Sequence, residues 1–427
     1  MKEQKQSNYP KVLLINEQCI NSNNATGITL RSLWRSWPTE RLFELYRDQR
    51  ETVKGEKLIV PSGKLFSFVS RRLEKRSALV KANDRIKEKN DNEKKSVGKM
   101  RQAAVLLYQC ISVSLDTETF ERIQEFAPEV IYTLGGSPFV LNAVHKLSAK
   151  LKIPVIIHFM DNWVEHYQWE ENKWTFFYRT AMDRALRRCV QRARCSVVIS
   201  PQMANAYQRI FNTPQFVLMN SVDVNGIHCS RKEEDDIVRF VYAGGLHLQR
   251  YKALKEIAEA IQNANLRNDK QGVLAIYTSE AEFNRVALEF AGLPVEYCKP
   301  VGHEQIKRIF KDADVLVHTE VANVNLEGFF CYSISTKIPE YLSSGRTILF
   351  YGPSDMGLTQ YLKQGKSAVV VSSRRELNEK IHLLIENPFQ KEIIENAKKM
   401  AENNHCIDKA HETLLSAIKY AVSESVN

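Results

Sequence analysis

The sequence lacks the marks of a membrane-spanning, secreted or disulfide-stabilised protein. No stretch approaches the roughly 20 consecutive apolar residues that cross a bilayer, and the first residues, Met1-Lys-Glu-Gln-Lys, are too polar for a signal segment. The eight cysteines include no CxxC pair and no zinc-ligand spacing, which is typical of reduced thiols in a cytosolic protein. We therefore expect a cytoplasmic protein that is at most peripheral on the inner face of the plasma membrane.

Several short signatures of common functions are also missing. The chain has no GxSxG, which disfavours a hydrolase of that type. It has neither GxxxxGK[ST] nor GxGxxG, so any phosphate site must be built differently. RRM, KH and helix-turn-helix signatures are absent, which leaves a nucleic-acid-binding protein as a less favoured alternative.

Basic residues outnumber acidic ones. The 427 residues hold 60 Lys and Arg against 50 Asp and Glu, a net charge of +10, and this balance favours anionic partners. Residues 71–101 alone hold 12 basic and 5 acidic side chains, so much of the excess lies in one insertion. The insertion is either a patch for an anionic membrane surface or phosphorylated acceptor, or a solvated surface loop.

Short apolar runs alternate with helical patterns along both halves of the chain. Such runs predict buried strands of parallel sheets that helices cover on both faces. They are residues 11–15, 129–132, 155–158, 196–199, 238–243, 273–277, 315–318, 347–350 and 368–371. A polar stretch from 220 to 236 predicts a linker between them. The sequence therefore predicts an α/β fold with two Rossmann-like, doubly wound domains, 1–225 and 236–400, and a ligand cleft beyond the carboxyl ends of their strands.

One stretch of the second domain predicts a helix start suited to a phosphate. Ser335 and Thr336 are good N-cap residues and Lys337 follows them, so free N–H groups and the helix dipole would face an anion. Glu340 falls about one turn later, where its carboxylate could reach a pair of hydroxyls. An ordinary capped helix that ends at Gly345 explains this stretch equally well.

A second basic stretch opens the same domain. Gly244 and Gly245 follow a predicted strand and would let backbone approach a ligand closely. Arg250 and Lys252 come just before a predicted helix and could each neutralise part of a diphosphate. Taken alone, two such basic residues are more often surface charges.

Together, the two stretches resemble the GT-B glycosyltransferases, specifically the family 4 group of retaining enzymes, and the resemblance covers nearly the whole chain. The segment Thr26-Gly27-Ile28-Thr29 resembles the glycine-containing first loop of that family. Ile157-His158-Phe-Met-Asp-Asn-Trp163 resembles its N-domain histidine segment. The resemblance implies sugar transfer from a nucleotide-diphosphate sugar with retention, no metal ion and no cofactor beyond that co-substrate. It also implies that a C-terminal helix, 405–427, packs back on the N-terminal, acceptor-side domain.

The resemblance further implies roles for individual residues. Arg250 and Lys252 would hold the donor diphosphate and stabilise charge on the leaving group, and His158 would face the donor sugar. The other residues implied to bind the donor are Gly244, Gly245, Ser335, Thr336, Lys337 and Glu340. Thr26 and Gly27 belong to the first loop, whose backbone would approach the donor and the acceptor closely.

The sequence departs from the family at one acidic position. Members often carry two Glu separated by seven residues, but Tyr332 stands where the first would precede Glu340. Glu327 is the nearest earlier acid, and either a longer loop brings it to the sugar or that contact is absent. Asp312-Ala-Asp314 spells the DxD of metal-dependent transferases of another fold, but its place before a strand predicts a structural role.

The resulting expectation is a glycosyltransferase that acts on a glycan or lipid-linked acceptor in surface polysaccharide biosynthesis. A nucleotide-sugar 2-epimerase of the same architecture is the main alternative. It usually needs a set of carboxylates in the cleft, which the sequence does not allow us to assign.

Overall fold

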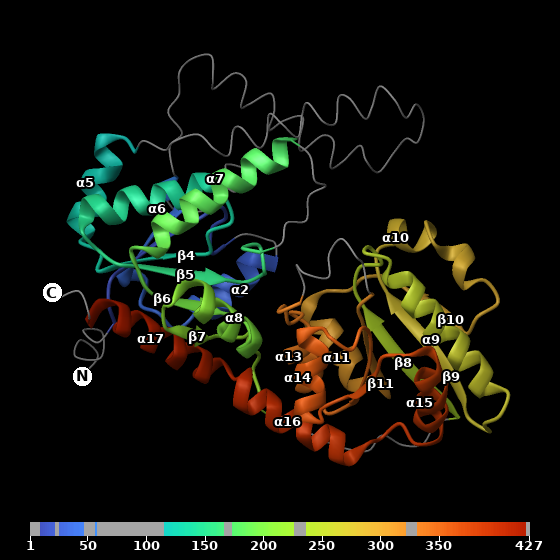
Figure 1. The fold of residues 1–427 in the computed structure, drawn as a ribbon. Helices are drawn as coiled ribbons and strands as arrows, with labels where there is room; N and C mark the ends of the chain where they lie inside the picture. The colour runs from blue at the N-terminus through green and yellow to red at the C-terminus, as the bar shows by residue number, and fades with distance from the viewer. Residues whose placement is uncertain are drawn as a thin grey trace.

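We describe the fold from a computed structural model of the chain. The structure describes residues 9–21, 25–46, 56–57, 115–165, 173–225, 236–321 and 331–423. Two predicted features, the basic insertion 71–101 and Glu327, lie outside the described residues. Figure 1 shows two sheet-containing units, an N-terminal one in blue to green and a C-terminal one in yellow to orange.

The N-terminal unit contains a parallel sheet with strand order β3-β2-β1-β4-β5-β6-β7 among the described residues. Its strands are β1 (Val12–Asn16), β2 (Leu42–Tyr46), β3 (Glu56–Lys57), β4 (Val130–Thr133), β5 (Val155–Phe159), β6 (Ala193–Val198) and β7 (Gln215–Val217). The helices are α2 (Ala25–Trp34), η1 (Thr39–Arg41), α5 (Thr117–Phe126), α6 (Pro138–Leu151), α7 (Lys173–Val190) and α8 (Pro201–Phe211). From β1 the strands β2 and β3 extend the sheet to one side and β4 to β7 extend it to the other, so a topological switch point lies between β1 and β4.

The C-terminal unit repeats this plan with strand order β10-β9-β8-β11-β12-β13 in the described part of the chain. Its strands are β8 (Ile237–Ala243), β9 (Gln271–Tyr277), β10 (Val295–Cys298), β11 (Val315–Thr319), β12 (Thr347–Tyr351) and β13 (Val369–Val371). The helices are α9 (Arg250–Asn265), α10 (Glu280–Asn284), η2 (Ala287–Phe290), α11 (His303–Asp312), α13 (Ile338–Leu342), α14 (Gly357–Gly365), α15 (Arg374–Glu386) and α16 (Lys391–Asn404), and a last helix, α17 (Ile407–Ser423), packs on the N-terminal unit. The switch point here lies between β8 and β11.

The predicted α/β class with two doubly wound sheets is confirmed, and all nine predicted strands are present. Four strands toward the sheet edges were not predicted: β2, β3, β7 and β10. In β2, β7 and β10 most residues are half-buried or exposed, so these strands carry less of the continuous apolar signal that marked the central strands.

Helices begin where the sequence supplies a cap. Ser137 and Ser200 each precede a proline, and their hydroxyls accept hydrogen bonds from Val140 N at 3.2 Å and Met203 N at 3.1 Å. A capping hydroxyl satisfies one free N–H, and proline at the first helical position needs none. Helices α6 and α8 therefore start immediately after β4 and β6, at the edge of the sheet that faces the other unit.

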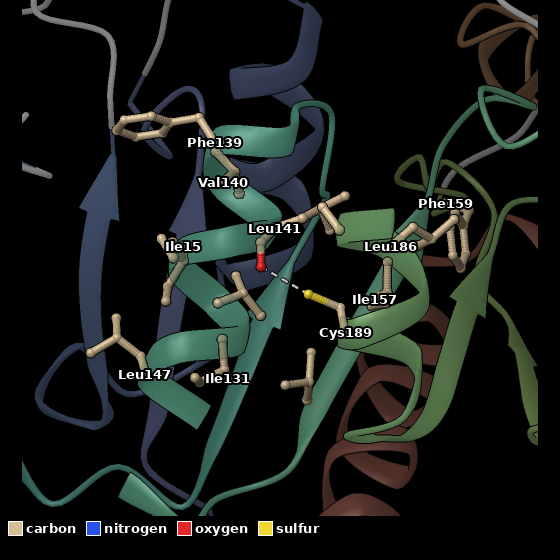
Figure 2. Close-up of a cluster of buried hydrophobic side chains, with 14 of the residues drawn as sticks. Ile15, Ile131, Phe139, Val140, Leu141, Leu147, Ile157, Phe159, Leu186 and Cys189 are labelled. Atoms are coloured by element: carbon tan, nitrogen blue, oxygen red, sulfur yellow. Dashed lines mark hydrogen bonds between the residues drawn. The ribbon is translucent and has the colours of Figure 1, made fainter. Parts of the chain in front are cut away.

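Apolar side chains from α6, α7 and the central strands fill one face of the N-terminal sheet. Figure 2 shows Ile15, Ile131 and Ile157 of the strands beneath the two helices. Within this cluster the Cys189 thiol donates to Leu141 O at 2.9 Å, and burial raises its pKa to about 12. This cysteine is therefore an unreactive core residue that joins α7 to α6.

The last two helices return the chain to the N-terminal unit. Figure 1 shows α16 and α17, in red, running from below the C-terminal unit to below the N-terminal one. Helix α17 buries Leu414, Ala417 and Ile418 against the sheet face that carries Val12 and Leu14. The N-terminal core is therefore completed by residues from the far end of the chain.

Candidate functional site

A hollow with a volume of about 630 Å³ lies between the two units. Loops after β1, β4 and β5 line it from the N-terminal unit, and residues after β8, β11 and before α13 line it from the C-terminal unit. Both switch points therefore open onto one cavity, which is where ligands bind to such sheets. Its lining from the C-terminal unit is His247, Arg250, Glu320, Ser333, Ile334, Ser335, Thr336, Lys337, Met356 and Leu358.

Arg250, the first residue of α9, forms a bidentate ion pair with Glu320, just after β11. The two N–O distances from Arg250 Nη2 are 2.9 and 2.8 Å, and Nε lies 3.2 Å from Oε2. Both side chains are largely buried, at 16% and 13% exposure. Burial opposes ionisation of Glu320, but His318 and Arg250 hold its pKa below the ordinary value. Glu320 therefore stays charged and orients the guanidinium at the cavity wall.

Lys337 supplies a second cation to the same wall. Its Nζ lies 5.6 Å from the centroid of the Tyr242 ring, and a side chain at Gly244 would collide with the ammonium. Burial and then repulsion from Arg250 lower the pKa of Lys337 to about 8, against the attraction of nearby carboxylates. An anion in the cavity would favour the charged form of this lysine.

The opposite wall is acidic and polar. Glu17 follows β1 and accepts a short hydrogen bond from the Ser137 hydroxyl. Asp161 follows β5, and its Oδ1 accepts from the Ser333 hydroxyl of the other unit at 3.3 Å. Burial raises the pKa of Asp161 to about 6, although the Ser333 hydrogen bond opposes the shift. The cavity therefore has a cationic side and a side that carries carboxylates.

Several predicted residues do meet at this cavity. Arg250, Ser335, Thr336, Lys337 and Thr26 all line it. Gly244 and Gly245 lie behind the lining, where Gly244 makes room for the Lys337 ammonium. Their conformations are not left-handed, so the requirement at Gly244 is for space and not for backbone freedom.

The start of α13 differs in detail from the prediction. Lys337 is the N-cap residue and no side chain caps the helix, whereas Ser335 and Thr336 were expected to cap it. Ser335 contributes its backbone oxygen, which accepts from Ile338 N at 3.0 Å. Pro339 occupies the first turn of the helix, and Gly345, with φ of 75°, follows the helix end.

Two of the predicted donor-site residues do not reach the main cavity. Lys252 is exposed on the outer side of α9, because two residues further along a helix turn the side chain by roughly 200°. Glu340 faces α11, where its Oε1 lies 3.4 Å from His303 Nδ1, and it borders a separate hollow of about 260 Å³. Burial raises the pKa of Glu340 against the pull of His303 and Lys307.

Two predicted residues of the N-terminal unit also lie away from the cavity surface. His158 is buried within β5, and its Nδ1 lies 2.5 Å from Tyr132 Oη. Burial lowers the pKa of His158 to about 3, so the ring is neutral at physiological pH. Gly27 belongs to the first turn of α2 and not to a loop, while the neighbouring Thr26 and Thr29 line the cavity.

Tyr332, which occupies the position of the missing acid, points toward the N-terminal unit. Its ring lies 6.5 Å from that of Tyr207, and it packs against the N-terminal core. Asp314 has the structural role expected of it, since its Oδ2 accepts from Arg239 N at 2.8 Å.

Sequence reasoning missed three acidic residues of the cavity, Glu17, Asp161 and Glu320. Each lies one or two residues beyond a strand that was predicted, β1, β5 and β11 respectively. An acid just beyond the carboxyl end of a buried parallel strand was the available signal, because ligands gather at that edge. No group of three or more metal-ligating side chains occurs among the described residues, and no helix in the described ranges is long and apolar enough to span a bilayer.

Comparisons with known proteins agree with this architecture. A family model described as glycosyl transferase-like matches residues 250–416. The structure of Anabaena HepE in complex with UDP and glucose is 12% identical, with a TM-score of 0.56 over 96% of this chain and 99% of that one. Sucrose-phosphate synthase from Thermosynechococcus elongatus is also 12% identical, with a TM-score of 0.56 over 97% and 99%.

A third similar structure is the lipopolysaccharide outer core galactosyltransferase WaaB, at 11% identity and a TM-score of 0.56 over 97% of this chain and 99% of that one. No curated protein sequence matches the chain significantly. At these identities the structural likeness establishes the fold, while the family model adds the domain type. The predicted GT-B fold is thereby confirmed, and residues 250–416 match a glycosyl transferase-like family model, while membership of family 4 and retention stay predictions.

Proposed function

We propose that this protein transfers a sugar from a nucleotide-diphosphate sugar to a hydroxyl of a glycan or lipid-linked acceptor, with retention at the anomeric carbon. The observation that carries the proposal is the pairing of Arg250 and Lys337 on one wall of the cavity between the units. Two cations that are buried together repel each other, and a bound diphosphate would offset that repulsion.

In the proposed reaction the leaving group is the nucleoside diphosphate. The bond between the anomeric carbon and the phosphate oxygen breaks, and the cations of Arg250 and Lys337 stabilise the charge that develops on that oxygen. The acceptor oxygen attacks from the same face, and its proton passes to the departing phosphate. Because the charge is neutralised by side chains, the proposed mechanism requires no metal ion.

Glu320 acts on this reaction through Arg250. Its bidentate contact sets the direction of the guanidinium and so positions it toward the cavity. Ser335 and Thr336 would add polar contacts to the phosphates from the start of α13. Contacts of this kind gain strength in a site that excludes water.

The biological setting is proposed from the similar structures. One of them is described as a lipopolysaccharide outer core galactosyltransferase and another was solved with UDP and glucose. We infer a role in surface polysaccharide biosynthesis, carried out in the cytoplasm at the inner face of the membrane, with the basic insertion 71–101 as the membrane contact. Neutralising the charge of that insertion is expected to weaken binding to anionic vesicles and to leave donor hydrolysis intact.

Ligand screening tests the proposed function directly. A ligand that binds only the folded state raises the melting temperature, so UDP-, GDP- and ADP-sugars are compared by thermal shift. We expect one nucleotide series to stabilise the protein, and the Lys337→Ala variant to lose most of that effect. Product analysis without acceptor then separates the two enzyme classes, since release of the epimeric sugar would indicate a 2-epimerase. A protein that no nucleotide sugar stabilises would contradict the proposal.

A further inference from the structure

Two buried polar atoms on the N-terminal wall of the cavity have no hydrogen-bond partner among the described residues. They are Asn16 Nδ2, a donor, and Gln18 Oε1, an acceptor. Asn16 is 1% exposed, and its orientation is set because its Oδ1 accepts from Leu134 N at 2.8 Å. A buried polar atom without a partner costs about 1–3 kcal/mol. One donor and one acceptor are therefore available for the polar atoms of a ligand.

Asp161 adds a carboxylate to the same wall. Its Oδ1 accepts the 3.3 Å hydrogen bond from the Ser333 hydroxyl, and the two carboxylate oxygens together have capacity for further hydrogen-bond donors. Burial raises its pKa to about 6, so the group is largely ionised at neutral pH and gains from additional hydrogen-bond donors.

The sheet sets the separation of these three side chains. Asn16 ends β1, Gln18 follows it, and Asp161 follows β5, with β4 between the two strands. Strands that are two places apart in a sheet are separated by roughly 10 Å. The loop after β4 contributes Gly135 and Gly136, and a Cβ at Gly136 would meet only Glu17 Cγ, at 4.0 Å. A single ring with polar groups on opposite sides can therefore lie over the glycines.

The chemistry of this wall selects among ligands. An anionic group is disfavoured because Glu17 and Asp161 are both present, and an apolar group would leave the Asn16 and Gln18 atoms unsatisfied. A hydroxyl can donate and accept at once, so a set of neighbouring hydroxyls matches a carboxylate, a donor and an acceptor together.

We propose that Asn16, Gln18 and Asp161 form a hydroxyl-binding subsite for one sugar ring, across the cavity from the cations. The inference rests on the proposed function for the place of the diphosphate and deepens it by assigning the residues that select the sugar. That ring is either the transferred sugar of the donor or the first sugar of the acceptor, since both present the same hydroxyls.

Three substitutions test the subsite with little change of shape. Asn16→Asp keeps the acceptor for Leu134 N and removes the free donor. Gln18→Met removes the free acceptor, and Asp161→Asn removes the charge. Gln202→Met is the matched control, because Gln202 Oε1 is also buried without a partner among the described residues but does not line this cavity. Melting temperatures establish that each variant folds.

Binding of UDP and of UDP-glucose is measured by calorimetry. If the thermal-shift screen selects another base, the nucleoside diphosphate of that base and its glucose conjugate are used. Methyl glycosides of common hexoses are tested by saturation-transfer NMR with and without UDP. If the ring is the donor sugar, the three variants weaken UDP-glucose about tenfold each, as one lost hydrogen bond predicts, and leave UDP unchanged. If the ring is the acceptor sugar, the three variants bind UDP and UDP-glucose as the wild type does and lose binding of the methyl glycosides.

The subsite is overturned if folded Asn16→Asp and Asp161→Asn bind UDP-glucose and glycosides as the wild type does, or if Gln202→Met is impaired to the same extent. That result leaves the proposed function standing whenever the wild type binds UDP. If the wild type binds no nucleotide but binds glycosides in a manner sensitive to Asn16, the proposed function fails and the subsite is retained.

Discussion

The charge on Lys337 depends strongly on its surroundings. Burial and the nearby Arg250 lower its pKa to about 8 from 10.5. In the absence of ligand a substantial fraction is thus neutral at slightly alkaline pH, and folding releases a proton in that range. The contribution of Lys337 to stability therefore rises with pH from about 8 to 10.5, while its ability to attract an anion falls.

This shift predicts a pH-dependent affinity for the donor. The wild-type affinity for UDP-glucose is expected to decrease as pH rises from 7 to 9, because the free protein loses the Lys337 charge near pH 8. Lys337→Arg should abolish this dependence, since a guanidinium stays charged throughout. Calorimetric titrations at four pH values check the expectation, and a wild-type profile as flat as that of Lys337→Arg would contradict it.

Arg250 and Lys252 are expected to differ sharply, although they lie two residues apart. Arg250→Ala should reduce transfer by about 10²-fold or more, because it removes a cation from the cavity wall. Lys252→Ala should leave the rate close to that of the wild type, because that side chain is exposed outside the cavity. Initial rates with saturating donor distinguish the two.

The loss of Arg250 also leaves Glu320 buried without its ion-pair partner, which costs about 3–5 kcal/mol of stability. Rates are therefore compared on protein shown to be folded by near-UV circular dichroism. Arg250→Lys retains a charge but not the bidentate geometry, and an intermediate rate is expected for it. Equal rates for the alanine variants at 250 and 252 would remove the basis for the assigned site.

At the scale of elements, α17 belongs to the fold of the N-terminal unit although it ends the chain. Ala410, Leu414, Ala417, Ile418 and Ala421 recur at helical spacing, and the helix packs them against β4, β5, β6 and β7. Small alanines at three of these positions let the helix lie close to the sheet, and the two larger residues fill the space between strands.

Leu414→Ala is expected to lower the free energy of unfolding by about 2–5 kcal/mol, because it opens a cavity in this interface. Leu383→Ala is the matched control, since Leu383 is 49% exposed and its truncation should have little effect. Urea denaturation of both variants gives the comparison. Equal losses would mean that α17 is not part of the N-terminal core.

At the scale of the whole molecule, His405 lies where the chain returns to the N-terminal unit, and it joins that segment to the linker and to α14. Its Nδ1 lies 2.7 Å from Asn220 O, its Nε2 lies 2.8 Å from Tyr361 Oη, and its backbone oxygen accepts from Val222 N at 2.8 Å. The His405 ring is buried between α16 and α17, and burial lowers its pKa to about 4. The neutral ring therefore holds the linker, α14 and the returning helices together.

Acid is expected to weaken this junction. The pKa values of His405 and His158 lie near 4 and 3 in the folded protein and near 6.5 when the rings are exposed. The unfolded state therefore binds more protons below pH 6.5, and stability should fall by up to about 1.4 kcal/mol per pH unit for each ring between pH 6.5 and 4.

Urea denaturation at pH 7, 6 and 5 measures this slope. His405→Gln should be less stable at pH 7, since it loses a ring contact, but its stability should depend less on pH than that of the wild type. An unchanged slope would show that His405 does not set the acid response.

The sequence by itself determined the layered fold and the side of the sheets on which a ligand binds. Continuous apolar runs are typical of parallel strands covered on both faces, and the nine predicted runs correspond to nine strands. It also determined that Arg250 and Lys337 lie at strand and helix ends, because Gly244 and Pro339 mark those boundaries locally. These are consequences of neighbours in the chain, which a sequence displays directly.

Only the tertiary structure decided which of these residues share a wall. Lys252 turns away because of its helical phase, Glu340 faces α11, and His158 is held inside the sheet by Tyr132. Glu320 and Asp161 reach the cavity because strands far apart in sequence end side by side. Such proximity depends on strand order and on packing between the two units, and neither quantity is encoded in the spacing of residues along the chain.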